Sequence, residues 1–124
     1  PFIQRAGVAA LTGPHAHVAW QVAAYRARRD RFVAGLTSLP GVACPVPAGA
    51  FYVFPDFSTL LAEHGLGSAA LAVRLLERHG VAAIDGAKFG ARGEGRLRFS
   101  FASAATDVEA ALARVAECVT TLAR

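Results

Sequence analysis

Apolar residues recur three and four positions apart in four stretches of the chain, and this spacing predicts four helices. The first stretch runs from Phe2 to Leu11 and ends at the turn Thr12-Gly13-Pro14. The second is long, begins at about His15 and is stopped by Pro40-Gly41. Its apolar stripe, in which Arg29 fills one slot, consists of Val18, Val22, Tyr25, Phe32, Leu36 and Leu39.

Two further helices are predicted in the second half of the chain. Ser68 is expected to act as the N-cap of a helix from Ala69 to His79, which Gly80 ends. The leucines expected to face inward from this helix are Leu71, Leu75 and Leu76. The segment Thr106-Asp107-Val108-Glu109 has the pattern of a capping box and opens the last helix. The stripe of that helix is Val108, Leu112, Val115, Val119 and Leu122.

Four short segments have the composition of strands, namely residues 42–46, 50–54, 81–84 and 96–101. Pro45 and Pro47 place the first of them at a sheet edge. The second is apolar on both faces, so we expect it to be covered on both sides. Residues 57–67 are expected to form a loop with at most one helical turn. Because helices and strands occur in blocks, the sequence predicts an α+β fold with a short sheet of about four strands covered by helices.

The strand at residues 96–101 carries the most informative residue, Arg98. Side chains alternate along a strand, so one face would hold three apolar residues, Leu97, Phe99 and Phe101. The opposite face would then present Arg98 between Arg96 and Ser100. A guanidinium held on a rigid strand is suited to bidentate binding of a carboxylate or a phosphate. The alternative is an ordinary solvated strand face, since arginines are mostly exposed.

Composition narrows the class of protein. With 124 residues, of which 54% are hydrophobic and 18% charged, the chain suffices for one globular domain with a real core. No apolar run reaches the length of a membrane span and no signal peptide is visible, so we expect a soluble, cytoplasmic protein. The net charge of +4 raises the option of nucleic-acid binding, but acidic residues lie among the basic ones and the sequence does not favour it.

Other candidates for chemistry are weak. The glycines at 86, 90, 93 and 95 precede a strand rather than a helix, so they do not form a phosphate loop. His15 and His17 diverge on a helix, and no further ligand completes a metal site. His64 and His79 have no nucleophile in a recognisable motif, and Lys88 is expected to be solvated. We predict that both cysteines, Cys44 and Cys118, are buried as reduced thiols. We therefore assign no catalytic, cofactor-binding or metal-binding residue.

Several segments together carry a family resemblance. The segment Pro47–Asp56 resembles the P-x-G-A-F-Y-x-F strand of class I/II aminotransferases, which are pyridoxal-phosphate (PLP) enzymes of the aspartate aminotransferase superfamily. Their G-x-x-F-G loop and R-x-S-[FY]-A strand are matched by residues 86–90 and 98–102. The helical segment Tyr25–Asp30 and the turn Leu39–Val42 are similar to two further motifs of the family. The match spans nearly the whole chain in the family's order.

The resemblance implies a specific place for this chain. Residues 1–124 would form a single domain, the C-terminal small domain of a larger aminotransferase that passes an amino group between an amino acid and a 2-oxo acid through PLP. By the matching position, Arg98 would bind the substrate α-carboxylate. The family's Schiff-base lysine and the Asp paired with the cofactor lie in an upstream large domain, so Lys88 is not the catalytic lysine. Because it lacks that lysine, this piece alone is expected to be inactive, and we expect no PLP bound to it. The family forms homodimers, which we expect of the whole protein.

Three further features of the sequence bear on this expectation. The chain begins at Pro1 and contains no Met, which leads us to expect a piece of a longer protein. Asp85 stands where the family usually has Pro before the loop glycine, and this affects the expected loop geometry. The aromatic run around Phe51 is expected to be mostly core, with its uncovered face docking against a missing partner. The alternatives are another PLP-dependent enzyme of the same fold, or an independent basic α+β module that binds RNA or a protein partner.

Overall fold

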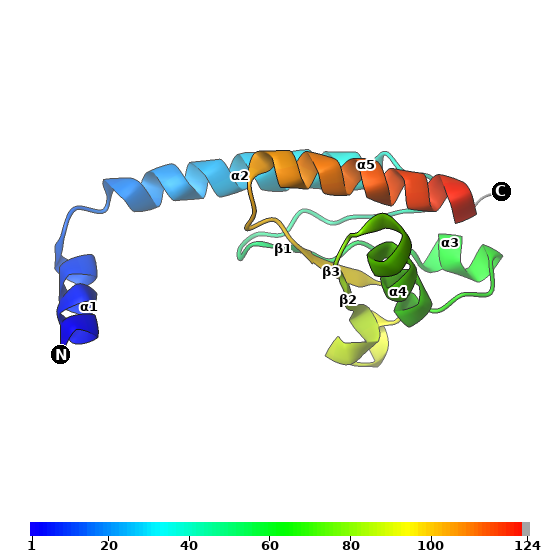
Figure 1. Ribbon diagram of the computed structural model, residues 1–124, viewed down its shortest axis with the longest axis horizontal. Coiled ribbons are helices and arrows are strands. Elements are labelled where there is room, and N and C mark those ends of the chain that lie inside the picture. Colours follow the sequence, from blue (N-terminus) through cyan, green and yellow to red (C-terminus); the bar gives the residue numbers. More distant parts are fainter. Residues whose placement is uncertain (123–124) are drawn as a thin grey trace.

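The computed structural model describes residues 1–122 and shows helices layered on a small sheet (Figure 1). The helices are α1 (Phe2–Thr12), α2 (Ala16–Thr37), α3 (Ser58–Glu63), α4 (Ser68–His79) and α5 (Ala105–Leu122). The strands are β1 (Tyr52–Val53), β2 (Ile84–Asp85) and β3 (Leu97–Ser100). Two short 3-10 turns, η1 (Gly86–Phe89) and η2 (Ala91–Gly93), lie between β2 and β3.

The sheet has β3 at its centre, with β1 and β2 antiparallel on either side. Tyr52 pairs with Ser100, and Ile84 pairs with Arg98. The predicted α+β fold is confirmed, with three strands in place of about four. The segment at residues 42–46 adds only a single bridge, from Ala43 to Asp56. Pro45 within this segment and Pro47 just after it cannot donate to a ladder, which explains why pairing does not extend further.

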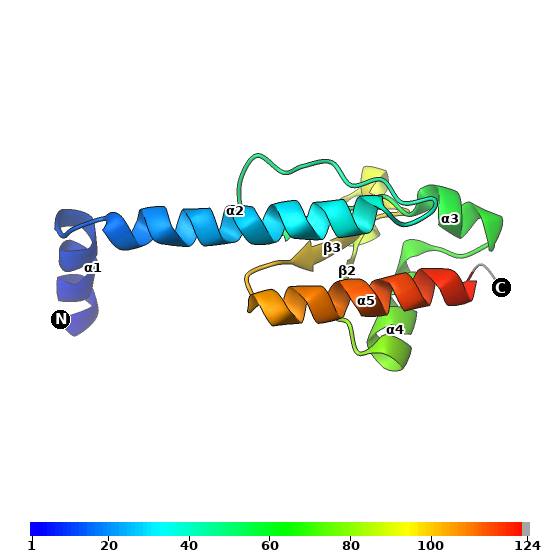
Figure 2. The same ribbon diagram turned by 90° about the horizontal axis from the view of Figure 1, so that it is seen from above.

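One face of the sheet is covered by α2 and α5, which lie side by side (Figures 1 and 2). The apolar side of β3 points into this layer, and Leu97 and Phe101 are fully buried. The Phe99 ring meets the Phe32 ring of α2 edge to face, with 5.8 Å between the ring centroids. The whole predicted stripe of α5 is buried, namely Val108, Leu112, Val115, Val119 and Leu122.

The predicted stripe of α2 is only half buried. Phe32 and Leu36 lie in the core, whereas Val18 and Val22 are exposed because the first half of α2 extends beyond the sheet. α1 lies at the far end of α2, away from the rest of the chain (Figure 1), and none of its residues is buried. Over residues 1–122, no helix combines the length and the apolar character needed to cross a membrane.

The predicted helix boundaries need two corrections. Ser68 is not an N-cap, because α4 already includes it and Gly67 holds the cap position. Thr106 does not open a capping box, because α5 begins at Ala105. The predicted stop of α4 is confirmed, since Gly80 has a φ of +64°, a left-handed conformation that glycine adopts without strain. Leu76 is exposed, not inward.

Two predicted segments differ in extent and burial. Residues 57–67 were expected to be mainly loop, but α3 forms there and buries Leu60 and Leu61. An Asp56 carboxylate oxygen accepts hydrogen bonds from the Ser58 amide and hydroxyl, which stabilises the start of this helix. The predicted strand at residues 50–54 is reduced to β1 and is not fully covered, because Phe51 is exposed and Tyr52 is half-buried.

Candidate functional site

The alternation predicted for β3 is confirmed. Leu97, Phe99 and Phe101 are buried, while Arg98 is half-buried on the opposite face. Because Arg98 sits on the central strand, both neighbouring strands constrain its backbone. The Ser100 hydroxyl, expected beside it, accepts a hydrogen bond from the Ala102 amide at 3.2 Å and so shapes the turn that follows β3.

The Arg98 guanidinium lies against two aromatic rings. Its central carbon is 4.3 Å from the centroid of the Tyr52 ring on β1 and 4.7 Å from that of the Phe89 ring on η1. Phe89 in turn meets Phe54 edge to face, with 5.9 Å between ring centroids. Each aromatic contact favours the cation by about 0.5–2 kcal/mol and restricts the rotamers of a long side chain. The sequence prediction did not include Tyr52 and Phe89 as partners of Arg98.

Arg98 differs from its neighbour Arg96 in its charge environment. Arg96 forms an ion pair with Asp56 at 2.8 Å. Burial raises the pKa of the Asp56 carboxyl, but hydrogen bonds from Ser58 and the Arg96 charge more than offset this, so its pKa is lowered overall. The Arg98 guanidinium makes no hydrogen bond or ion pair with any of residues 1–122. A positioned guanidinium with unused N–H donors can bind an anion.

Asp85, which stands where the family usually has Pro, keeps a proline-like backbone at the start of the loop next to Arg98. The Asp85 φ is −53°, within the range that proline adopts, so the backbone keeps the conformation that proline would impose. Its carboxylate accepts hydrogen bonds from the Ala87 amide at 3.1 Å and from the Ser68 hydroxyl at 2.7 Å. The Ser68 hydrogen bond, followed by that from Ala87, lowers the Asp85 pKa.

The other candidates are dispersed. Lys88, His15, His17 and His64 are exposed. Among residues 1–122, no group of three or more His, Cys, Asp or Glu side chains could hold a metal ion. The predicted burial of both thiols is confirmed. Burial raises the pKa of the Cys44 thiol to about 11, which leaves it a poor nucleophile at neutral pH.

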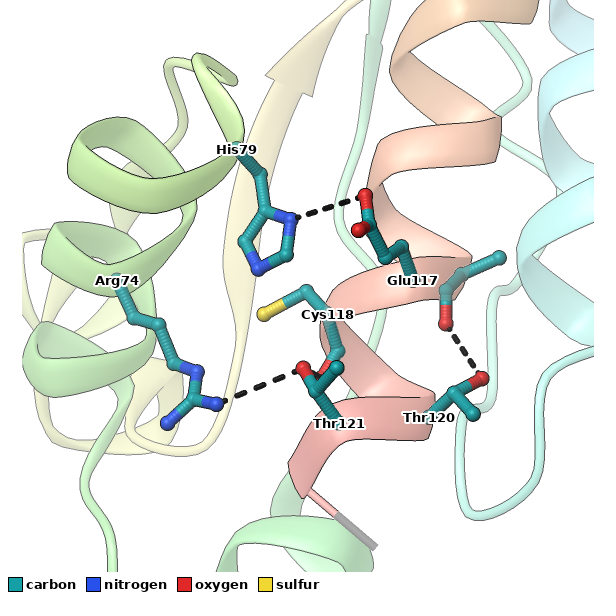
Figure 3. A network of polar contacts seen from close by, with 7 residues as sticks. Arg74, His79, Glu117, Cys118, Thr120 and Thr121 are labelled. Atoms are coloured by element: carbon teal, nitrogen blue, oxygen red, sulfur yellow. Dashed lines mark hydrogen bonds and ion pairs between the residues drawn. The ribbon is translucent and has the colours of Figure 1, made fainter. Parts of the chain in front are cut away.

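His79 belongs to a polar contact network between α4 and α5 (Figure 3). Its Nδ1 lies 3.4 Å from a Glu117 carboxylate oxygen, and Arg74 reaches across to the Thr121 hydroxyl at 3.5 Å. The Cys118 side chain lies between these two contacts. The network is on the α5 side of α4 and joins two packed helices, so we interpret it as structural.

Comparison with known proteins agrees with this architecture. The sequence profile of the family "Aminotransferase class I and II" matches residues 2–115. The chain is 39% identical over 120 residues to an aspartate aminotransferase of Musicola paradisiaca, covering 96% of this chain and 29% of that protein. A solved structure of the aspartate aminotransferase from Rhizobium meliloti aligns with a TM-score of 0.86 at 31% identity, covering 94% of this chain and 30% of that one.

A PLP-bound aminotransferase from Clostridium difficile 630 also aligns, with a TM-score of 0.68 at 26% identity over 77% of this chain and 24% of that one. The chain thus spans less than a third of the length of the relatives it matches. The family profile covers most of the described chain, including β1, the η1 loop and the strand that carries Arg98. The chain therefore belongs to the class I and II aminotransferase family.

Proposed function

We propose that this chain is the C-terminal small domain of a PLP-dependent aminotransferase and that Arg98 binds the α-carboxylate of the amino-acid substrate. The observation that carries the proposal is the state of the Arg98 guanidinium. It is fixed by β3 and two aromatic rings, yet it makes no ion pair within residues 1–122. Arg96, two residues earlier, is already paired with the Asp56 carboxylate and so is less available to bind a substrate anion.

The physical argument rests on preorganisation. A flexible arginine loses side-chain entropy when it binds an anion, whereas a held guanidinium loses less. A planar fork can meet both oxygens of a carboxylate, and each charge-assisted hydrogen bond contributes roughly 1.5–3 kcal/mol. Two such bonds would supply roughly 3–6 kcal/mol of substrate binding, provided that the rest of the protein shields the site from water.

The first helices support a role for a large domain outside this chain. Large apolar side chains of α1 and of the first half of α2 are exposed, namely Phe2, Ile3, Val8, Leu11, Val18, Trp20 and Val22. Exposed apolar surface of this extent is typical of an interaction site. We propose that the large domain covers it, and that the whole protein is a cytoplasmic homodimer.

The residues of this chain do not fit the cofactor itself. An imine with PLP needs a lysine, and Lys88 is exposed on η1 at a position that does not match the family's lysine. We therefore assign no PLP contact to residues 1–122 and derive no reaction step through PLP. In our proposal the cofactor is held by the upstream domain, and this chain contributes the carboxylate-binding arginine.

The experiment compares the whole protein with the 124-residue chain. Each is incubated with PLP, an amino-acid donor and 2-oxoglutarate, and the 2-oxo acid formed from the donor is quantified. We expect turnover by the whole protein and none by the chain alone. Catalytic turnover by the chain alone would refute the assignment of the cofactor chemistry to the upstream domain. Release of CO₂ without a 2-oxo acid product would point to another reaction on the same fold.

An independent RNA- or protein-binding module is the less favoured alternative, because the family match extends over residues 2–115. The charge distribution agrees with this, since several of its arginines are already paired with carboxylates. Examples are Arg29 with Asp30 and Arg31 with Glu109. A salt-dependent shift of the chain with RNA at micromolar concentration would favour the alternative.

A further inference from the structure

A buried serine joins the start of α4 to both ends of the loop that carries Phe89. Ser68 is fully buried. Its hydroxyl donates to the Asp85 carboxylate at 2.7 Å, at the beginning of the loop. Its backbone amide donates to a Glu94 carboxylate oxygen at 2.9 Å, at the end of the loop. One residue on a helix therefore holds two carboxylates that are nine positions apart.

These contacts differ from those of an ordinary helix cap. A capping serine uses its hydroxyl to satisfy an amide of its own helix. Here the Ser68 hydroxyl bonds to another element, and the α4 amide is satisfied by Glu94, which lies 26 residues further along the chain. The contacts with Ser68 lower the pKa values of both carboxyls, and two carboxylates at a helix N-terminus are electrostatically favourable. The result is a connection between helix and loop.

The two ends of the loop lie close together at Gly86, Gly93 and Arg96, which we call the loop neck. Gly86 and Gly93 lie backbone to backbone, so that a Cβ atom on either would overlap the carbonyl oxygen of the other. The Gly86 amide donates to the Arg96 carbonyl at 2.8 Å, and the Arg96 amide donates to the Gly93 carbonyl at 3.1 Å. With the neck closed, the position of Phe89 depends on where the neck is attached to the rest of the domain.

We propose that Ser68, Asp85 and Glu94 act as positioning residues, which fix the loop against α4 and thereby hold the Phe89 ring on the Arg98 guanidinium. The inference rests on the proposed role of Arg98. The path runs from α4 through two carboxylates to the loop neck, and from Phe89 to Arg98 across a ring-to-guanidinium distance of 4.7 Å. None of the three residues contacts the Arg98 side chain within hydrogen-bond distance.

The test uses paired variants in the whole protein. Glu94→Ala and Asp85→Ala remove the acceptor, whereas Glu94→Gln and Asp85→Asn keep an oxygen in the same place. Glu63→Ala, an exposed carboxylate at the end of α3, is the matched control. Steady-state KM and kcat for an amino-acid donor are measured at pH 7. A second readout is the ring-current shift of the Arg98 Nε–H resonance in ¹⁵N-arginine-labelled protein, assigned with Arg98→Lys.

We expect the two alanine variants to raise KM by about tenfold with kcat within about twofold. The substrate carboxylate is unchanged by amino transfer, so weaker binding of it by Arg98 affects the ground state and the transition state alike. The amide variants and Glu63→Ala should stay within about twofold of the parent, since the acceptor oxygen or the whole contact is retained. The Arg98 Nε–H shift should move toward the random-coil value only in the alanine variants.

Two results would overturn the inference. One is an unchanged Arg98 Nε–H shift in both alanine variants. The other is a loss confined to kcat or shared equally by the amide variants, which would indicate a structural or charge role instead. If the parent protein itself makes no 2-oxo acid, the proposed function fails, while the Nε–H shift still decides whether these residues position Phe89 on Arg98.

Discussion

Arg74 offers a sharp test of the packing between α4 and α5, because its replacement should stabilise the protein. The Arg74 Nε is buried and has no hydrogen-bond partner among residues 1–122. The guanidinium donates a 3.5 Å hydrogen bond to the Thr121 hydroxyl, at the outer limit of hydrogen-bond length, and its charge lies close enough to the Cys118 thiol to oppose the rise in the pKa of that thiol caused by burial. We therefore choose Arg74→Met, which keeps an unbranched apolar stem in the same space (Figure 3).

The magnitude follows from what is lost and what is relieved. A buried donor without a partner costs about 1–3 kcal/mol, whereas the long contact with Thr121 contributes little. Thr121 keeps its own hydrogen bond to the Cys118 carbonyl at 2.9 Å, so the substitution leaves its hydroxyl paired. Arg74→Met should thus raise the free energy of unfolding by about 1–2 kcal/mol. For a chain of this size, that corresponds to a rise in Tm of roughly 4–8 °C.

The assay is differential scanning calorimetry of the chain at pH 7, with Arg78→Met as the control. Arg78 lies one turn further along α4 and is exposed, so its replacement should change stability by less than about 0.5 kcal/mol. A Tm that falls by several degrees in Arg74→Met, with Arg78→Met unchanged, would refute the reasoning. It would mean that the Arg74 charge stabilises the interface between α4 and α5.

Two further predictions concern ionisation. The Asp85 and Glu94 pKa values are lowered in the folded chain, so their contribution to stability is present above the unfolded values of about 4 and is lost as pH falls through the lower folded values. Calorimetry from pH 7 to pH 2 should show that the Tm of the parent chain falls below about pH 4, and that the fall is smaller in the double variant Asp85→Asn/Glu94→Gln. An equal fall in the parent chain and the variant would contradict this. Burial raises the Cys44 pKa to about 11, so iodoacetamide at pH 8 should alkylate Cys44 roughly 100-fold more slowly than a free cysteine. The rate is followed by mass spectrometry, and labelling of Cys44 at the rate of a free cysteine would contradict this prediction.

Periodicity made β3 and the helices predictable. The alternation of residues 96–101 places Arg98 opposite three buried apolar residues, and the structure has this arrangement. The α5 stripe was predictable for the same reason, since helical spacing and burial coincide over its whole length. The exposed start of α2 was not, because an apolar stripe does not indicate whether its partner lies within the same chain.

The parts that could not be predicted depend on contacts between distant residues. Tyr52 and Phe89 reach Arg98 through the β1–β3 register and the path of the η1 loop. Ser68 is a residue type that often caps helices, but its hydroxyl bonds instead to Asp85, which lies 17 positions further along the chain. A local signal did exist for α3, because Asp56 precedes Ser58 by two residues and this spacing favours a side chain that accepts from the helix start.

The central claim is that Arg98 binds the carboxylate of the substrate. The most direct measurement compares an amino-acid donor with the primary amine that lacks its carboxylate, in the whole protein and in Arg98→Leu. The control is Arg92→Leu, an exposed arginine of η2 on the same loop. For the parent protein and the control we expect kcat/KM to be about 10²–10⁴ higher for the amino acid, from two charge-assisted hydrogen bonds.

In Arg98→Leu this preference should fall to within about tenfold, because the amino acid loses its partner while the amine loses nothing. The ratio of the two kcat/KM values isolates the carboxylate from any general loss of activity. If Arg98→Leu retained the preference of the parent protein, the carboxylate would be bound elsewhere and the account of Arg98 would be wrong.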